Sequence, residues 1–140
     1  MAEIIVGYDG SDSSRAALDQ AVDLAKSLGD GVVLVFGYAP HGYGGGEVKA
    51  QRDAVKELGE RVTAEGLERA KSAGVEAEVE LEPMHPVHAL NEAVRKRNGR
   101  MIVVGNYGEA PLKGAILGST TYKLLHEAEA PVLVVPPPAG

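Results

Sequence analysis

The 140-residue sequence contains no cysteine, no tryptophan and a single phenylalanine. Without cysteine the chain has no disulfide bonds, no thiolate metal ligands and no cysteine nucleophile. With so few large aromatic side chains, a stacking surface for single-stranded nucleic acid is not expected. Basic residues are also scarce, since 14 Lys and Arg stand against 20 Asp and Glu for a net charge of −6. This balance disfavours non-specific binding to nucleic acid or to anionic membranes.

Long apolar runs are missing as well. No stretch approaches the roughly 18 residues of a membrane span, and Met1-Ala2-Glu3 does not begin a signal peptide, so we expect a cytoplasmic protein. The composition, 44% hydrophobic and 24% charged, is that of a globular protein. The length predicts one domain, residues 1–140, with enough buried surface for one core. Glycine is in excess at 18 residues, so the positions of the glycines decide the interpretation.

Short apolar runs alternate along the chain with stretches of helical periodicity. The runs are residues 4–6, 32–36, 75–81, 101–104 and 132–135, and the helical stretches begin near residues 13, 48, 86 and 119. This alternation predicts an α/β fold with an open parallel sheet and helices on both faces. Four runs are apolar on consecutive residues, as in strands buried on both sides. The run 75–81 instead alternates with glutamates and is predicted to be an edge strand with a solvated face.

Glycines and polar residues gather where the predicted strands end, which is where ligands bind in open α/β sheets. The segment Gly105-Asn106-Tyr107-Gly108 is followed, nine residues later, by Gly118-Ser119-Thr120 at the start of a helix. Helix N-terminal amides and two hydroxyls would form an anion site there, and the glycines would let the backbone approach a ligand. A plain connection in which Ser119 is only an N-cap is the alternative, and the spacing alone leaves both open.

Three blocks of the sequence resemble the nucleotide-binding form of the universal stress protein family. The family pattern of Gly, two residues, Gly, nine residues, Gly and Ser/Thr is matched by Gly105, Gly108, Gly118 and Ser119. Residues 5–11 (IVGYDGS) resemble its first strand and acidic turn, and residues 130–135 (APVLVV) resemble its last strand. These blocks follow one another in the family's order along the whole chain.

The resemblance implies five parallel strands in the order 3-2-1-4-5 and ATP, with Mg²⁺, in a cleft beyond the first and fourth strands. Asp9 would then hold the adenine or ribose side, Gly37 would offer backbone to adenine, and Gly118 would hold the outer phosphates. The complete set of implied binding residues is Gly7, Tyr8, Asp9, Gly37, Val104, Gly105, Gly108, Gly118, Ser119 and Thr120. The resemblance also implies a homodimer through the fifth strand, Val132–Val135, whose apolar edge a two-fold partner would cover.

Two classes of function stay open on the sequence. One is an ATP-binding regulatory module of the stress response, with unidentified protein partners and at most slow ATP hydrolysis. The alternative is an ATPase or phosphotransferase that uses the same pocket, and a nucleotide-free interaction protein is a weaker third. No general base or arginine finger is evident, and the P-loop pattern is absent, so no catalytic residue is predicted and enzyme activity is left open.

Several side chains have a structural alternative to a functional role. Asp9 either contacts the ligand or braces the first helix, and the neighbouring Ser11, Asp12 and Ser13 can cap that helix in its place. His85, His88 and Glu92 fall on adjacent helical turns, but they lack a fourth ligand and no metal site is predicted. Lys113 is either a phosphate contact or a solvated loop residue. Two positions depart from the family pattern, Arg100 and the Met84-His85-Pro86 turn.

Overall fold

The computed structural model describes residues 1–38, 46–106 and 119–136. Strands and helices alternate along these residues, with the bounds β1 (Glu3–Gly7), α1 (Asp12–Leu28), β2 (Gly31–Gly37), α2 (Gly46–Ser72), β3 (Ala77–Glu82), α3 (Pro86–Lys96), β4 (Gly99–Gly105), α4 (Ser119–Glu127) and β5 (Val132–Val135). Each apolar run of the sequence is therefore a strand. None of the helices in the described segments combines the length and the apolarity that crossing a bilayer demands.

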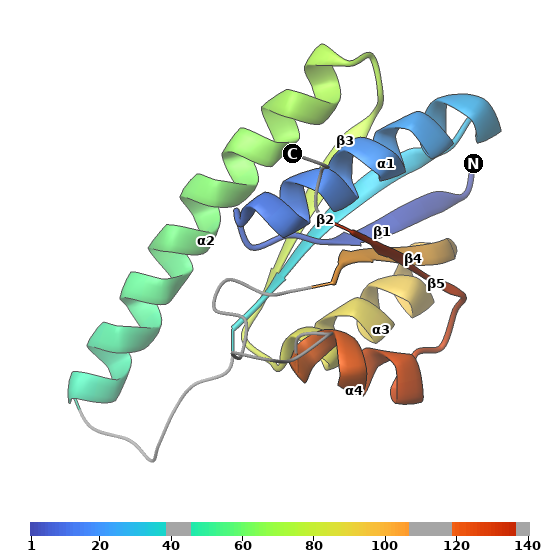
Figure 1. The fold of residues 1–140 in the computed structure, drawn as a ribbon. Helices are drawn as coiled ribbons and strands as arrows, with labels where there is room; N and C mark the ends of the chain where they lie inside the picture. Colours follow the sequence, from blue (N-terminus) through green and yellow to red (C-terminus); the bar gives the residue numbers. More distant parts are fainter. Residues whose placement is uncertain (39–45, 107–118, 137–140) are drawn as a thin grey trace.

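All strand pairs are parallel, and the sheet order is β3-β2-β1-β4-β5. This confirms the expected topology, including the place of β3 at an edge. Helices α1 and α2 cover one face of the sheet, while α3 and α4 cover the other (Figure 1). The chain reverses direction across the sheet at β1, which has β2 on one side and β4 on the other. Ligand sites in open α/β sheets lie at such a switch point.

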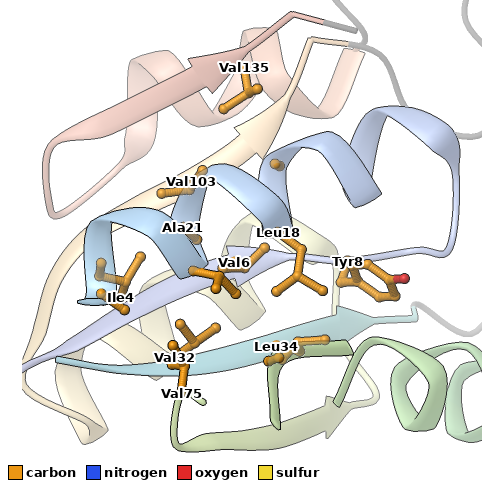
Figure 2. Close-up of a cluster of buried hydrophobic side chains, with 14 residues drawn as sticks. Ile4, Val6, Tyr8, Leu18, Ala21, Val32, Leu34, Val75, Val103 and Val135 are labelled. Carbon is orange, nitrogen blue, oxygen red and sulfur yellow. The ribbon is translucent and has the colours of Figure 1, made fainter. Parts of the chain in front are cut away.

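The two faces of the sheet bury separate apolar layers, because successive strand residues point to opposite faces. From β1 and the residue after it, Ile4, Val6 and Tyr8 pack with α1 and α2, whereas Ile5 packs with α3 and α4. Figure 2 shows the first layer, in which Leu18 of α1 lies over β1. All five of these side chains are almost completely buried. The two layers therefore determine which residues of β1 point to each side of the sheet.

Two glycines let the long helix α2 lie close against the sheet. A Cβ atom at Gly66 would come 2.5 Å from a methyl carbon of Leu34 and 2.8 Å from the ring of Tyr8. A Cβ atom at Gly59 would come 2.7 Å from the ring of Phe36. The two positions are seven residues apart and so share one helix face. Close packing therefore accounts for glycines that, in a helix interior, each cost about 1 kcal/mol relative to alanine.

Two glutamates of β3, Glu80 and Glu82, are less solvated than the alternating pattern predicted, whereas Glu78 is exposed. The guanidinium of Arg97 bonds to Glu78 and, at 2.8 Å, to Glu80, and Lys96 lies 3.6 Å from Glu80. Burial of Glu80 opposes its ionisation, but the hydrogen bond and charge of Arg97 outweigh that effect, so the pKa of Glu80 lies below its ordinary value. The basic end of α3 thus neutralises this edge strand, which is a tertiary contact that the strand pattern alone did not reveal.

Arg100, one of the two departures from the family pattern, has a structural partner in Asp30. Its Nε and Nη2 atoms donate to the two carboxylate oxygens of Asp30 at 2.6 and 3.2 Å. The Asp30 side chain is only 2% exposed, and a buried carboxylate without compensation is costly. The pair therefore ties the start of β4 to the residue that precedes β2.

Candidate functional site

A cleft of about 260 Å³ opens beyond the carboxyl ends of β1, β2 and β4, at the switch point of the sheet. It is lined by Gly7, Tyr8, Asp9, Ser14, Val35, Phe36, Gly37, Pro86, Leu90, Val104, Gly105, Thr120 and Thr121. Of the predicted residues, the cleft therefore brings together Gly7, Tyr8, Asp9, Gly37, Val104, Gly105 and Thr120. Ser119 is exposed at the first position of α4, outside this lining. Gly108, Gly118 and Lys113 lie outside the described residues.

The lining residues that the sequence did not single out come mostly from helix starts. Ser14 belongs to the first turn of α1, Pro86 and Leu90 to α3, and Thr121 to α4. In a parallel sheet every helix that follows a strand begins at the carboxyl edge, so these positions could have been added from the strand–helix boundaries alone. Val35 and Phe36 end β2 beside them.

Asp9 has the bracing role that the sequence offered as its alternative, and it also lies in the cleft. Its Oδ1 accepts hydrogen bonds from the backbone N–H of Ser11 at 3.0 Å and from the Ser11 hydroxyl at 2.5 Å. Ser11 in turn is the N-cap of α1, where its Oγ accepts from the N–H of Ser14. Gly10, with φ of 84°, makes the sharp turn between them. The carboxylate therefore stiffens the turn that forms one wall of the cleft.

Two of the predicted glycines are required by packing inside the protein. A Cβ atom at Gly105 would come 1.9 Å from Ser13 Oγ and 2.6 Å from the Ser13 carbonyl oxygen, because α1 starts directly against the end of β4. A Cβ atom at Gly37 would come 2.7 Å from Pro86 and 2.8 Å from the Met84 carbonyl. At both glycines, atoms of the protein itself therefore fill the space where a side chain would be. The sequence had instead explained these glycines by the approach of a ligand.

The side chain of Tyr8 is directed away from the cleft. Its ring is 2% exposed and packs in the layer under α1 and α2, near Leu18 and Leu34 (Figure 2). Burial raises the pKa of its hydroxyl. Any contact of Tyr8 with a ligand would therefore use its backbone.

Helix α4 is fixed to β4 beside the cleft. The Thr121 hydroxyl donates to the Gly105 carbonyl at 2.9 Å, and Leu124 is completely buried in the second apolar layer. Because Thr120 and Thr121 line the cleft, the N-terminal turn of α4 faces it. The positive end of a helix dipole favours anions at this place.

The second departure from the family pattern, at Met84-His85-Pro86, forms the start of α3. His85 is the N-cap, and its Nδ1 accepts from the N–H of Val87 at 3.2 Å. Burial, with smaller contributions from the positive charge of Lys123 and from His88, lowers the pKa of His85, while Glu127 acts in the opposite direction. The cap needs the neutral ring, because Nδ1 must be free to accept. The rings of His85 and His88 lie 6.0 Å apart, and the described part of the chain contains no group of three or more side chains arranged for a metal ion.

The chemistry of the lining is that of a site for a small organic molecule with a polar end. Val35, Phe36, Leu90 and Val104 supply apolar surface, while Thr120 supplies a hydroxyl group beside the helix N-terminus. Ligand sites usually combine a mostly apolar wall with a few placed polar groups. The fold and the cleft together define an open, doubly wound α/β protein with a ligand-sized site at its switch point.

The chain belongs to the universal stress protein family, whose model matches residues 1–136. It is 30% identical to the universal stress protein YxiE of Bacillus subtilis, over 95% of this chain and 97% of that protein. It is 31% identical to the universal stress protein Rv1636 of Mycobacterium tuberculosis, over 94% of each chain. Among solved structures, it matches a universal stress protein in complex with cAMP at 27% identity and a TM-score of 0.77, over 98% of both chains.

Proposed function

We propose that the chain binds ATP, with Mg²⁺ on its phosphates, in the cleft at the switch point, and acts as a nucleotide-dependent regulatory module of the stress response. The observation that carries this proposal is the position of the α4 N-terminus at a cleft that also presents the apolar side chains of Val35, Phe36, Leu90 and Val104. An apolar wall suits a base, and a helix N-terminus suits a phosphate. The relative solved with cAMP, an adenine nucleotide, supports the same class of ligand.

Each part of the nucleotide has a matching part of the site in this proposal. Apolar side chains such as Phe36 and Leu90 would contact the base, and Asp9 would accept hydrogen bonds from ribose hydroxyls. Ser119 and Thr120 at the start of α4 would bind phosphate oxygens, together with Gly118 in the family motif. Mg²⁺ typically keeps several waters and binds through phosphates and one or two carboxylates, so it would arrive with the nucleotide.

The proposal is tested by identifying the ligand and then measuring its affinity. Mass spectrometry of the small molecules released from the purified, denatured protein should find an adenine nucleotide. Titration calorimetry with ATP, AMP, cAMP and GTP should then rank the adenine nucleotides above GTP. Thr120→Val, which removes one hydroxyl at nearly constant volume, should weaken ATP binding roughly 10-fold, as expected for a hydrogen bond to a charged group.

Two further variants test separately the glycine motif before α4 and the Asp9 turn after β1. Gly118→Val should abolish ATP binding while the protein still unfolds cooperatively, because it adds a side chain where phosphate would approach the backbone. Asp9→Asn should weaken the binding of ATP more than it weakens the binding of a 2′,3′-dideoxy analogue of ATP, which has no ribose hydroxyls for Asp9 to contact. A folded Gly118→Val protein with unchanged ATP affinity would contradict the proposed phosphate site.

Any hydrolysis is expected to be slow. Among the described residues that line the cleft, Asp9 is the only carboxylate, and one of its oxygens already accepts two hydrogen bonds from Ser11. A general base must lie within reach of the attacking water, whereas the proposed place of Asp9 is beside the ribose and not beside the outer phosphates. A phosphate-release assay under saturating ATP decides between the regulatory module and the ATPase or phosphotransferase alternative, since sustained turnover would favour an enzyme.

We also propose a homodimer formed through the open edge of β5. The carbonyls of Pro131 and Val135 accept hydrogen bonds from Ile102 of β4 and from Asn106 just after it. The backbone groups of Val132 and Val134 therefore point to the opposite side. That side is an unpaired edge within the described sheet. Leu133 beside it remains 37% exposed, and an open apolar edge favours pairing with a second chain.

Proline substitutions at the two edges of the sheet test the dimer. Val134→Pro removes an N–H that points to the open edge, where proline is tolerated in a monomer. Light scattering at micromolar concentration should therefore give a dimer mass for the wild type and a monomer mass for Val134→Pro. Val79→Pro, at the opposite edge on β3, is the matched control and should remain dimeric. A wild-type protein that is monomeric both with and without ATP would contradict the proposed dimer.

A cytoplasmic location and further protein partners remain expectations from the sequence.

A further inference from the structure

Helix α4 connects the cleft to a buried polar contact at its other end. The helix has nine residues, which corresponds to roughly 13 Å at 1.5 Å per residue. Its first turn lines the cleft, and its last residue, Glu127, lies against α3. A helix this short moves as a rigid rod, so its far end helps to set the position of its N-terminus.

The contact at the far end is made by Asn91 of α3, which is 6% exposed. Its Nδ2 donates to the carbonyl of Glu127 at 2.9 Å, and its Oδ1 accepts from the N–H of Glu129 at 3.0 Å. The carbonyl belongs to the last residue of α4, which has no partner within its own helix. One buried side chain therefore satisfies the end of α4 and the backbone that leads to β5.

Only an asparagine-like amide fits both bonds at once. One side of the group must donate and the other must accept, and rotating the amide by 180° would break both bonds. A second, exposed contact joins the same two segments, because Arg95 of α3 pairs with the carboxylate of Glu129. Exposed ion pairs hold geometry weakly, so the buried amide is the stronger constraint on α4.

We propose that Asn91 is a positioning residue for the phosphate-binding end of the cleft, acting through α4. This inference rests on the proposed function, since it assumes that the ligand's phosphate binds at the α4 N-terminus. The Thr121–Gly105 hydrogen bond holds the first turn of α4 to β4, and Leu124 holds its middle in the core. Asn91 supplies the third point, which stops the helix from tilting or sliding along its axis. A ligand without phosphate has no contact with that end and is insensitive to Asn91.

The test compares AMP with adenosine, because the ratio of their affinities isolates the phosphate contact. Asn91→Leu removes both hydrogen bonds at similar volume, and Asn91→Asp keeps the acceptor while losing the donor. In both variants AMP affinity should fall roughly 10-fold, as expected when a charged-group contact is misplaced, while adenosine affinity changes less than about twofold. Arg95→Gln, which removes the exposed contact between the same segments, should leave the ratio unchanged.

A measurement on the wild type makes the test independent of how well the variants fold. Coupling between two sites is reciprocal, so saturation with AMP should slow hydrogen exchange at the Glu129 amide more than saturation with adenosine does. A folded Asn91 variant that keeps the wild-type AMP to adenosine ratio overturns the inference, and so does equal protection of the Glu129 amide by both ligands. Wild-type protein that binds AMP no better than adenosine instead overturns the proposed phosphate site itself.

Discussion

Replacing Gly105 with alanine distinguishes a glycine needed for a ligand from a glycine needed for packing. The sequence motif assigns Gly105 to a ligand's approach, whereas in the structure the first turn of α1 fills the place of its missing side chain. A Cβ atom there would come 1.9 Å from Ser13 Oγ and 2.6 Å from the Ser13 carbonyl oxygen. The hydroxyl can rotate away, but the carbonyl is part of the helix backbone. Gly105→Ala must therefore displace the start of α1 from β4.

The size of the effect follows from that distance. Restoring an ordinary contact of 3.4 Å to the carbonyl oxygen requires α1 to retreat by about 0.8 Å. Overpacking in a well-packed interior costs about 1–3 kcal/mol, and a backbone neighbour places Gly105→Ala at the upper end of that range. For a chain of this length, about 3 kcal/mol corresponds to a decrease in Tm of roughly 6–12 °C.

Thermal and urea unfolding of Gly105→Ala without ligand measure this loss directly. Gly31→Ala is the matched control, because its Cβ would meet its nearest neighbour, the Glu76 carbonyl, at an ordinary 3.4 Å, and its stability should change by less than about 1 kcal/mol. Adding Ser13→Ala to Gly105→Ala should recover less than half of the loss, since the carbonyl remains. A Gly105→Ala protein with wild-type Tm but no nucleotide affinity would refute the packing argument.

Three further predictions concern stability. The pKa of His85 lies below its ordinary value of 6.5, so unfolding takes up a proton in mild acid; the stability that His85 contributes is complete above pH 6.5 and is lost as the pH falls through its folded pKa. His85→Asn, which keeps a capping side chain, should flatten this part of a stability profile measured by urea melts at a series of pH values. Arg100→Leu leaves the Asp30 carboxylate buried without its partner and should cost roughly 1–3 kcal/mol in urea melts, most of which Asp30→Asn in the same chain should restore. Gly66→Val should lower Tm more than Gly66→Ala, because α2 must move away from Tyr8; equal Tm values for the two variants would contradict this contact.

The elements and their order could be predicted because each rests on local patterns. Consecutive apolar residues in 32–36 and 101–104 have the composition of strands buried on both faces, and the Pro86 start of α3 is a standard helix signal. The edge position of β3 followed from its alternating glutamates. The partners of these glutamates could not be predicted, because Arg97 reaches Glu78 and Glu80 from the C-cap of α3, a separate segment of the chain.

The sequence predicted the general location of the candidate site, but it did not reveal what each residue of the site contacts. The spacing of Gly105, Gly108, Gly118 and Ser119 pointed to the end of β4 and the start of α4, and the described part of that edge does border the cleft. For Tyr8 and Gly105 the structure adds packing contacts that the motif does not show, since the ring of Tyr8 lies under α2 and a Cβ atom on Gly105 would meet Ser13. Both facts depend on how closely helices approach the sheet.

The sequence by itself determined the α/β class, the parallel sheet and the edge of the sheet at which the cleft lies, because hydrophobic period and glycine placement are local properties of the chain. Only the tertiary structure decided what each special residue contacts. Close approach of α1 made Gly105 obligatory, and the crossing of α3 and α4 made Asn91 the buried contact for the end of a helix thirty-six residues away. Such contacts join segments distant in sequence, so their geometry exists only once both layers have packed on the sheet.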